Sequence, residues 1–159
     1  MMPSRMNMDV ADVLILQASY TNPVHAEAIA RVLNHYAEDP MGGGQSLDPH
    51  LLEQLPAELA KRAHAFSVLA FVGGEPAGLV NCFEGFSTFA CRPLVNVHDV
   101  AVLSKFRGLG LSRKMLQKVE DIVAAASSPS KCSKAIRWPG PPTRSSGSAV
   151  PSSIRAMVR

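Results

Sequence analysis

The chain has 159 residues, of which 47% are hydrophobic and 18% are charged, as is ordinary for one soluble globular domain. Its formal net charge of +3 averages two unlike parts: residues 1–126 hold all 13 acids against ten Lys and Arg, whereas residues 127–159 hold six Lys and Arg and no acid. No apolar run approaches the roughly 20 residues of a membrane span, and we expect no membrane partner.

Cysteine usage and the N-terminal segment indicate a reducing compartment. The three cysteines, Cys82, Cys91 and Cys132, are odd in number and show no Cys-x-x-Cys spacing, which argues against a disulfide framework and against a zinc site. Residues 1–11 read as a flexible N-terminus without the apolar stretch of a secretory signal. We therefore expect a cytoplasmic protein that binds no metal.

The first part of the chain predicts a strand followed by two helices. Residues 13–16 are an apolar strand, and Asn22-Pro23 offers an N-cap with proline at the first position of a helix over 23–37. Asp48-Pro49 repeats this signal and begins a second helix, which Pro56 is expected to kink or split. The apolar stripe of that second helix is expected to be buried and consists of Leu51, Leu52, Leu55, Leu59 and Ala63.

The middle of the chain predicts an antiparallel hairpin, a connection, a further strand and a long helix. Two β-rich runs, 66–72 and 77–83, flank a short glycine-containing turn. Residues 84–94 read as a connection, 95–103 as a strand, and the segment from about Gly108 to Ala126 as an amphipathic helix. The buried face of this helix is expected to consist of Leu111, Met115, Leu116, Val119, Ile122 and Val123.

A glycine-bearing turn lies between that strand and that helix, with the sequence Arg107-Gly-Leu-Gly-Leu-Ser112. Amide N–H groups at a helix start have no intrahelical partner, and the helix dipole places partial positive charge there. Gly108 and Gly110 would let a phosphate reach the backbone without meeting a side chain. A plain tight turn, with Arg113 and Lys114 on a solvated helix face, is the alternative.

The turn resembles the acetyl-CoA pyrophosphate loop of GNAT-type N-acetyltransferases, whose pattern is Arg/Gln-x-x-Gly-x-Gly/Ala. Arg107 and Gly110 fit this pattern, and Ser112 takes the final small position. The order of elements over residues 12–126 is also similar to the first two-thirds of the GNAT fold. The resemblance implies an α/β (α+β) fold with a mixed, largely antiparallel sheet flanked by helices.

The resemblance implies transfer of an acetyl group from acetyl-CoA, a co-substrate that needs no metal, to a primary amine. In the family, backbone groups of the fourth strand pair with the pantetheine arm, which implies Val100, Ala101 and Val102 here. The turn and the helix start would bind the pyrophosphate. The residues implied there are Arg107, Gly108, Leu109, Gly110, Leu111, Ser112 and Arg113.

His98 and Asp99 occupy positions that match the acidic residue that deprotonates the amine in many members of the family. As neighbours on a strand they are expected to point to opposite faces. Histidine titrates near neutral pH and a half-buried aspartate attracts a cationic amine, while a structural role for either is the alternative. Glu84 is a further candidate, for recognition of the acceptor, which is a small-molecule amine or a protein amine.

Residues 127–159 form a basic tail with nine serines and five prolines, a composition typical of disorder. Another interpretation comes from the genetic code. If the reading frame is shifted by one base from Val123 onwards, some 25 consecutive codons permitted by the printed residues can encode a different string. That string contains KLTLEV, Ala-Ala-Tyr and Lys-Phe-Gly-Phe. That string resembles the segment after the third helix in GNAT proteins. We hypothesise that the frame slipped near Val123 and that 124–159 is not a selected sequence. Resequencing the codons for residues 120–129 tests this.

The hypothesis has a functional consequence, because the C-terminal strands and helix of the family would be missing. The chain has only two tyrosines, Tyr20 and Tyr36, so it lacks the fourth-helix tyrosine that commonly protonates the leaving thiolate in the family. This departure predicts weak or absent turnover. The alternative function is a non-catalytic module that binds CoA or a partner, possible partners being a second copy of the chain or nucleic acid. Trp138 is the one aromatic residue of the tail, which argues against nucleic acid.

Overall fold

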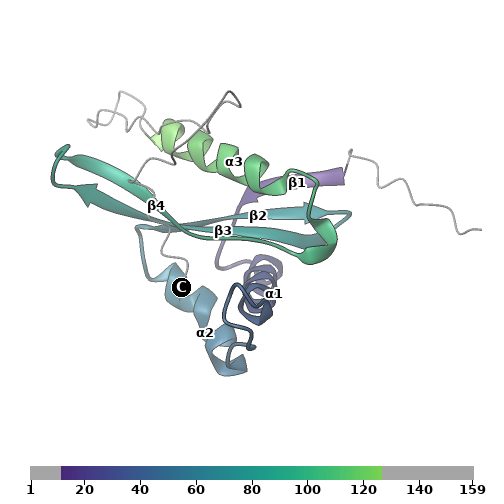
Figure 1. The fold of residues 1–159 in the computed structure, drawn as a ribbon. Helices are drawn as coiled ribbons and strands as arrows, with labels where there is room; N and C mark the ends of the chain where they lie inside the picture. Colours follow the sequence, from purple (N-terminus) through teal and green to yellow (C-terminus); the bar gives the residue numbers. More distant parts are fainter. Residues whose placement is uncertain (1–11, 127–159) are drawn as a thin grey trace, which may run out of the picture.

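The computed structural model describes residues 12–126 as a four-stranded antiparallel sheet with helices on both faces. The strands pair in chain order and are β1 (Val13–Gln17), β2 (Ala65–Val72), β3 (Glu75–Ser87) and β4 (Arg92–Val102). Figure 1 shows α1 (Pro23–Glu38) and α2 (Pro49–Ala60) on one side of the sheet and α3 (Leu111–Ala126) on the other. The predicted class, a largely antiparallel sheet flanked by helices, is confirmed.

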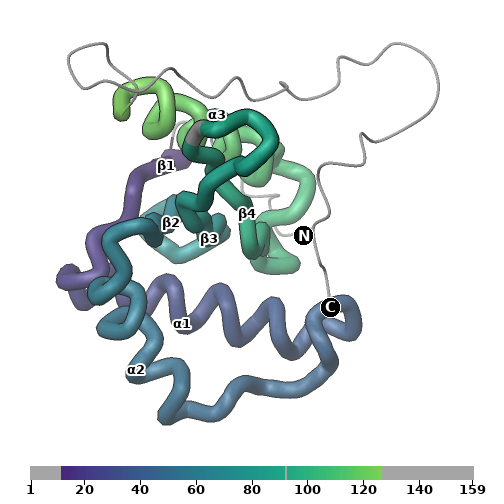
Figure 2. The backbone as a smooth tube through the Cα atoms, turned by 90° about the vertical axis from the view of Figure 1, so that its left-hand side faces the viewer, coloured from purple at the N-terminus to yellow at the C-terminus, as the bar shows by residue number. Residues whose placement is uncertain are grey.

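The core lies on both sides of the two central strands. β2 and β3 each contain a run of six buried residues, because α1 and α2 cover one face and α3 covers the other (Figure 2). Ile29 and Val32 come from α1, and Met115 comes from α3. Residues 1–11, predicted to be a flexible N-terminus, lie outside the described residues. So do residues 127–159, on which the frame hypothesis depends.

Both predicted helix caps are confirmed. The side chain of Asn22 accepts a hydrogen bond from the Val24 N–H at 2.9 Å, and the side chain of Asp48 accepts one from the His50 N–H at 2.8 Å. Each cap satisfies one of the backbone donors that a helix start leaves without a partner.

The predicted buried stripe of α2 is partly wrong. The helix is not split at Pro56, which is itself buried. Its inward face runs at i, i+3, i+4 and i+7 from Leu52 through Leu59, so Leu51 lies to the side and is 47% exposed. Ala63 is exposed because the helix ends at Ala60.

The connection predicted over 84–94 is wrong, because β3 continues to Ser87 and β4 begins at Arg92. Gly85 suggests the end of a strand in the sequence. In the structure, a Cβ on Gly85 would lie 3.0 Å from the Asn96 side chain, so side chains of β4 cover this glycine. The glycine thus permits pairing. The result is a long β3–β4 hairpin that extends past the helices in Figure 1.

The last helix begins at Leu111, three residues later than predicted. Gly108 and Gly110 have φ values of +88° and +69°, which cannot continue a right-handed helix. Of the predicted apolar face, Leu111, Met115 and Val119 are buried. The other three residues are only partly buried against the core, namely Leu116, Ile122 and Val123. Within residues 12–126, no helix has the length and apolar character needed to cross a membrane.

α3 lies close to the sheet at Gly78 of β3. A Cβ on Gly78 would lie 2.8 Å from Cε of Met115 and 3.2 Å from the Ala101 carbonyl oxygen. Met115 is fully buried, so its side chain has little room to move away. The missing side chain at position 78 therefore sets the distance between α3 and the sheet.

Cys82 is expected to resist thiol reagents in the folded protein, whereas the exposed Cys91 is expected to react. Burial raises the pKa of the Cys82 thiol to about 12, and the negative charge of Asp99 contributes in the same direction. At neutral pH its reactive thiolate fraction is then about 1,000-fold below that of an ordinary thiol. Labelling followed by peptide mass spectrometry measures this. Equal labelling of both cysteines without denaturant would contradict the packing of β3 against α3.

Candidate functional site

The turn between β4 and α3 exposes a row of backbone N–H groups. After the 3-10 turn Ser104–Phe106, the chain runs exposed from Arg107 to Gly110 before α3 begins. Among the described residues, the N–H groups of residues 108–113 donate to no other group. No heavy atom lies within 4 Å of a Cβ built on Gly108 or Gly110, so the approach is open. Such a helix start is suited to an anion.

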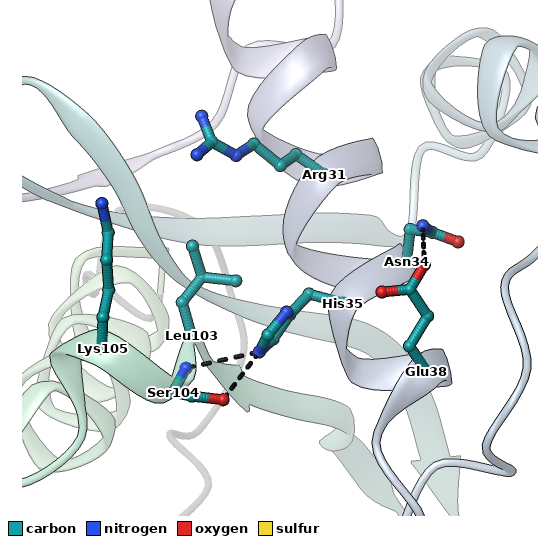
Figure 3. A pocket seen from close by; sticks show the side chains of 7 residues that line it. All are labelled: Arg31, Asn34, His35, Glu38, Leu103, Ser104 and Lys105. Atoms are coloured by element: carbon teal, nitrogen blue, oxygen red, sulfur yellow. Dashed lines mark hydrogen bonds between the residues drawn. The ribbon is translucent and has the colours of Figure 1, made fainter.

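The C-terminal end of α1 braces this turn. The Ser104 N–H donates to Nε2 of His35 at 3.3 Å, and the Ser104 hydroxyl lies 2.9 Å from the same nitrogen (Figure 3). Because a backbone N–H only donates, Nε2 is an acceptor and His35 is the neutral tautomer with its proton on Nδ1. Three residues further along, the Arg107 guanidinium pairs with Asp39, the C-cap of α1, at 2.8 Å.

Asp39→Asn is expected to lower the melting temperature at neutral pH and to have no effect in acid. The hydrogen bond from Arg107, followed by one from the Met41 N–H, holds the pKa of Asp39 below its ordinary value of 3.8. A lowered pKa in the folded state stabilises the protein above the unfolded value, and this stabilisation is lost as the pH falls through the folded pKa. Thermal unfolding of both proteins between neutral pH and about pH 3 measures the effect. A pH-independent difference would contradict the ion pair.

A pocket of about 430 Å³ lies between α1 and the start of this turn (Figure 3). Its lining is polar and mixed in charge, and consists of Arg31, Asn34, His35, Glu38, Leu103, Ser104 and Lys105. Lys105 forms an ion pair with Glu75, and the Asn34 side chain donates to Glu38. Because both signs of charge line it, the pocket does not select an anion by net charge.

The predicted phosphate contacts of the basic side chains divide into two groups. Arg107 is held by Asp39. Arg113 and Lys114 stand exposed on the first turn of α3 and pair with no acid among residues 12–126. Near the open N–H groups, these two side chains rather than Arg107 are the free cations.

β4 is an edge strand of the described sheet, so one of its sides has no neighbouring strand there. This matters for the backbone contacts predicted at Val100, Ala101 and Val102. The Leu103 N–H donates to the Ala77 carbonyl of the neighbouring strand at 2.9 Å. Backbone groups of an antiparallel strand alternate in direction, so those of Ala101 also face β3, whereas those of Val100 and Val102 face outward. Two of the three predicted backbone partners are therefore open to a ligand.

The prediction that His98 and Asp99 point to opposite faces is wrong. Asp99 pairs with Asn81 while Val97 pairs with Cys82, so His98 is an extra residue, a β-bulge in β4. Asp99 accepts a hydrogen bond from Asn81, and the ring of His98 meets Phe83 edge-on at 5.4 Å. Asn81 and Phe83 are two apart on β3 and share a face, so the bulge turns both candidates to the same side.

Glu84 is not brought to these residues. It lies on the opposite face of β3 from Asn81, and its side chain is exposed. Within residues 12–126, no group of three or more His, Cys, Asp or Glu side chains is arranged to hold a metal ion.

Sequence reasoning missed a row of polar side chains that leads to Asp99. Asn81 donates to Oδ2 of Asp99 at 2.9 Å, Ser67 donates to Oδ1 of Asn81 at 2.7 Å, and the Tyr20 hydroxyl lies 2.9 Å from that of Ser67. Ser67 and Asn81 are the buried polar residues of the described core. A single polar residue inside each of two apolar strands was the available signal.

Comparisons with known proteins agree with this geometry. A family model described as "Acetyltransferase (GNAT) family" matches residues 29–138. The thialysine N-epsilon-acetyltransferase of Caenorhabditis elegans is 29% identical over 102 residues, which are 63% of this chain and 60% of that protein. The chain thus spans about three-fifths of the length of this curated relative.

Solved structures share the fold at low sequence identity. A possible acetyltransferase from Clostridium difficile 630 superposes with a TM-score of 0.59 at 15% identity, covering 71% of this chain and 72% of that one. A ribosomal-protein-alanine N-acetyltransferase from Brucella melitensis biovar Abortus 2308 gives 0.58 at 18% identity, covering 72% and 74%. At such identities the likeness is one of fold.

Proposed function

The chain belongs to the GNAT acetyltransferase family, and on that premise we propose that it moves the acetyl group of acetyl-CoA onto a primary amine. The observation that carries the proposal is the turn between β4 and α3. Its N–H groups at residues 108–113 donate to no other group of the described residues, and both of its glycines leave free space above the backbone. A diphosphate is an anion that such a helix start accommodates.

The remaining contacts to acetyl-CoA are assigned to the same two elements. Arg113 and Lys114 add positive charge beside the phosphates. Val100 and Val102 offer outward backbone groups at the sheet edge, to which the amides of the pantetheine arm pair as a further strand would. This arrangement directs the thioester along β4 towards Asp99.

We assign the role of general base to Asp99. Its carboxylate accepts a proton from the attacking amine as the nitrogen forms a bond to the thioester carbonyl carbon. The carbon–sulfur bond then breaks, and CoA leaves as a thiolate. Asp99 is preferred to His98 for this role because Asn81 holds the carboxylate by a hydrogen bond, whereas the exposed His98 ring makes an edge-on contact with Phe83.

The leaving thiolate has no tyrosine assigned to it in this chain. Tyr20 is hydrogen-bonded at the far end of the row that begins at Asp99, and residues 37–159 contain no tyrosine. Solvent water then supplies the proton. The thiolate takes it up near neutral pH, because the pKa of an ordinary thiol is about 8.5. Because no side chain is assigned to protonate the leaving thiolate, we expect slow turnover.

The acceptor proposed is a primary alkyl amine, on a small molecule or on a protein. The relative from Caenorhabditis elegans is named for acetylation of the ε-nitrogen of thialysine, which is such an amine. The carboxylate of Asp99 attracts the ammonium form of such a ligand. This form must lose one proton to water before the neutral amine attacks, and Asp99 takes the second proton during the attack.

The test is to measure thermal stabilisation by acetyl-CoA together with release of free CoA in the presence of thialysine. Stabilisation with amine-dependent release supports the proposal. Stabilisation without release would instead support the second candidate, a binding module without turnover, which the absence of tyrosine from residues 37–159 favours. Neither effect at millimolar acetyl-CoA would contradict both.

A further inference from the structure

Asp99 is the end of a row of hydrogen-bonded side chains that crosses the whole sheet. Ser67 of β2, Asn81 of β3 and Asp99 of β4 are paired across neighbouring strands and lie on one face. Tyr20, which follows β1, completes the row. The row therefore runs from the segment after β1 across β2 and β3 to β4, in the order in which these strands pair.

The direction of every hydrogen bond in the row is determined. An ionised carboxylate only accepts, so the Asn81 amide nitrogen faces Asp99 and its oxygen faces Ser67. Ser67 must then donate its one proton to Asn81, which leaves its oxygen to accept from Tyr20. Burial raises the pKa of Tyr20 above its ordinary value of 10.0, so the phenol keeps the proton that it donates.

The bulge at His98 selects which residue joins the row. With regular pairing after the Cys82 and Val97 pair, Asn81 would lie opposite His98. The extra residue moves Asp99 into that position. A register change of one residue thus decides that a carboxylate, and not an imidazole, ends the row.

We infer that Asn81, Ser67 and Tyr20 are positioning residues that hold the Asp99 carboxylate in one orientation for acetyl transfer. This inference depends on the proposed function. Oδ2 of Asp99 is held by the hydrogen bond from Asn81, which leaves Oδ1 as the oxygen that we assign to the acceptor. Bonds aligned in one direction polarise one another, so each donor strengthens the next. The amide of Asn81 prevents proton loss along the row, because it does not pass protons on.

The test compares three variants that shorten the row at successive distances from Asp99. Asn81→Leu is expected to lower kcat by on the order of 10- to 100-fold, because a misplaced carboxylate accepts the proton of the attacking amine less efficiently. Ser67→Ala and Tyr20→Phe, which remove only a hydroxyl, are expected to lower kcat progressively less. The KM for acetyl-CoA should stay unchanged in all three, because the N–H groups of the turn are untouched. Cys82→Ala is the matched control, since it alters the same strand on its other face.

A spectroscopic readout separates this inference from the proposed function. The side-chain amide resonance of Asn81 is expected to move in Asp99→Ala and, by a smaller amount, in Tyr20→Phe. If the wild-type chain releases no CoA, the proposed function is contradicted, and the Asn81 resonance still decides whether the row exists. An unmoved resonance would overturn the inference. The inference would also be overturned if the three variants lost kcat only in proportion to their loss of melting temperature, with the same proportion in Cys82→Ala.

Discussion

Gly110→Ala is expected to weaken acetyl-CoA binding by on the order of tenfold or more, with a loss of about 1–2 kcal/mol in the free energy of unfolding. Gly110 has a φ of +69°, a conformation that an alanine adopts only under strain. Its Cβ would also enter the open space through which a phosphate reaches the backbone, since no atom lies within 4 Å of that position. Isothermal titration with acetyl-CoA measures the change in affinity.

Gly74→Ala is the matched control for this result. Gly74 lies in the β2–β3 turn, has a φ of +79° and, like Gly110, has nothing within 4 Å of the position of a Cβ. The two substitutions therefore impose similar backbone strain at different places. We expect similar losses of stability, with affinity reduced only for Gly110→Ala. Equal affinities of the two variants would show that the turn before α3 does not bind the pyrophosphate.

Asp99→Asn is expected to lower kcat by about 100-fold or more, the usual contribution of a general base. The asparagine keeps an oxygen that Asn81 can donate to, so the row of hydrogen bonds is retained and the loss reports the charge. Steady-state kinetics with acetyl-CoA and thialysine, in parallel with thermal unfolding, measure the effect. The KM for acetyl-CoA should remain close to its wild-type value.

Two further variants interpret that result. His98→Gln is expected to retain most of the wild-type kcat, because the imidazole packs against Phe83 and takes no proton in the proposed mechanism. Asp121→Asn makes the same chemical change on an exposed position of α3 and should leave kcat unaltered. A large loss of kcat in His98→Gln together with a normal kcat in Asp99→Asn would show that the histidine, and not the aspartate, is the base.

Local signals in the sequence were sufficient to predict most of the fold. Asn22 and Asp48 cap helices through contacts two residues away, so their effect does not depend on the rest of the chain. The apolar face of α3 follows from helical spacing alone. The prediction that the helix opens at Gly108 is wrong, because the positive φ values of Gly108 and Gly110 delay its start to Leu111.

The details of the site could not be predicted because they depend on register and on distant pairs. The bulge at His98 is a property of two strands together, and it reversed the expected relation between His98 and Asp99. Arg107 matches the phosphate-binding pattern in sequence, yet its partner Asp39 lies 68 residues earlier. No periodicity in either segment identifies the other.

The bare backbone at Gly78 has an evolutionary consequence. Any side chain there would collide with Met115, which anchors the first turns of α3, and with the carbonyl oxygen of Ala101. Positions 78 and 115 are thus expected to covary as sequences diverge, a bulkier residue at one being tolerated with a shorter residue at the other. If the first amides of α3 bind the pyrophosphate as proposed, mutational drift at this pair would change the affinity for acetyl-CoA by tilting that helix.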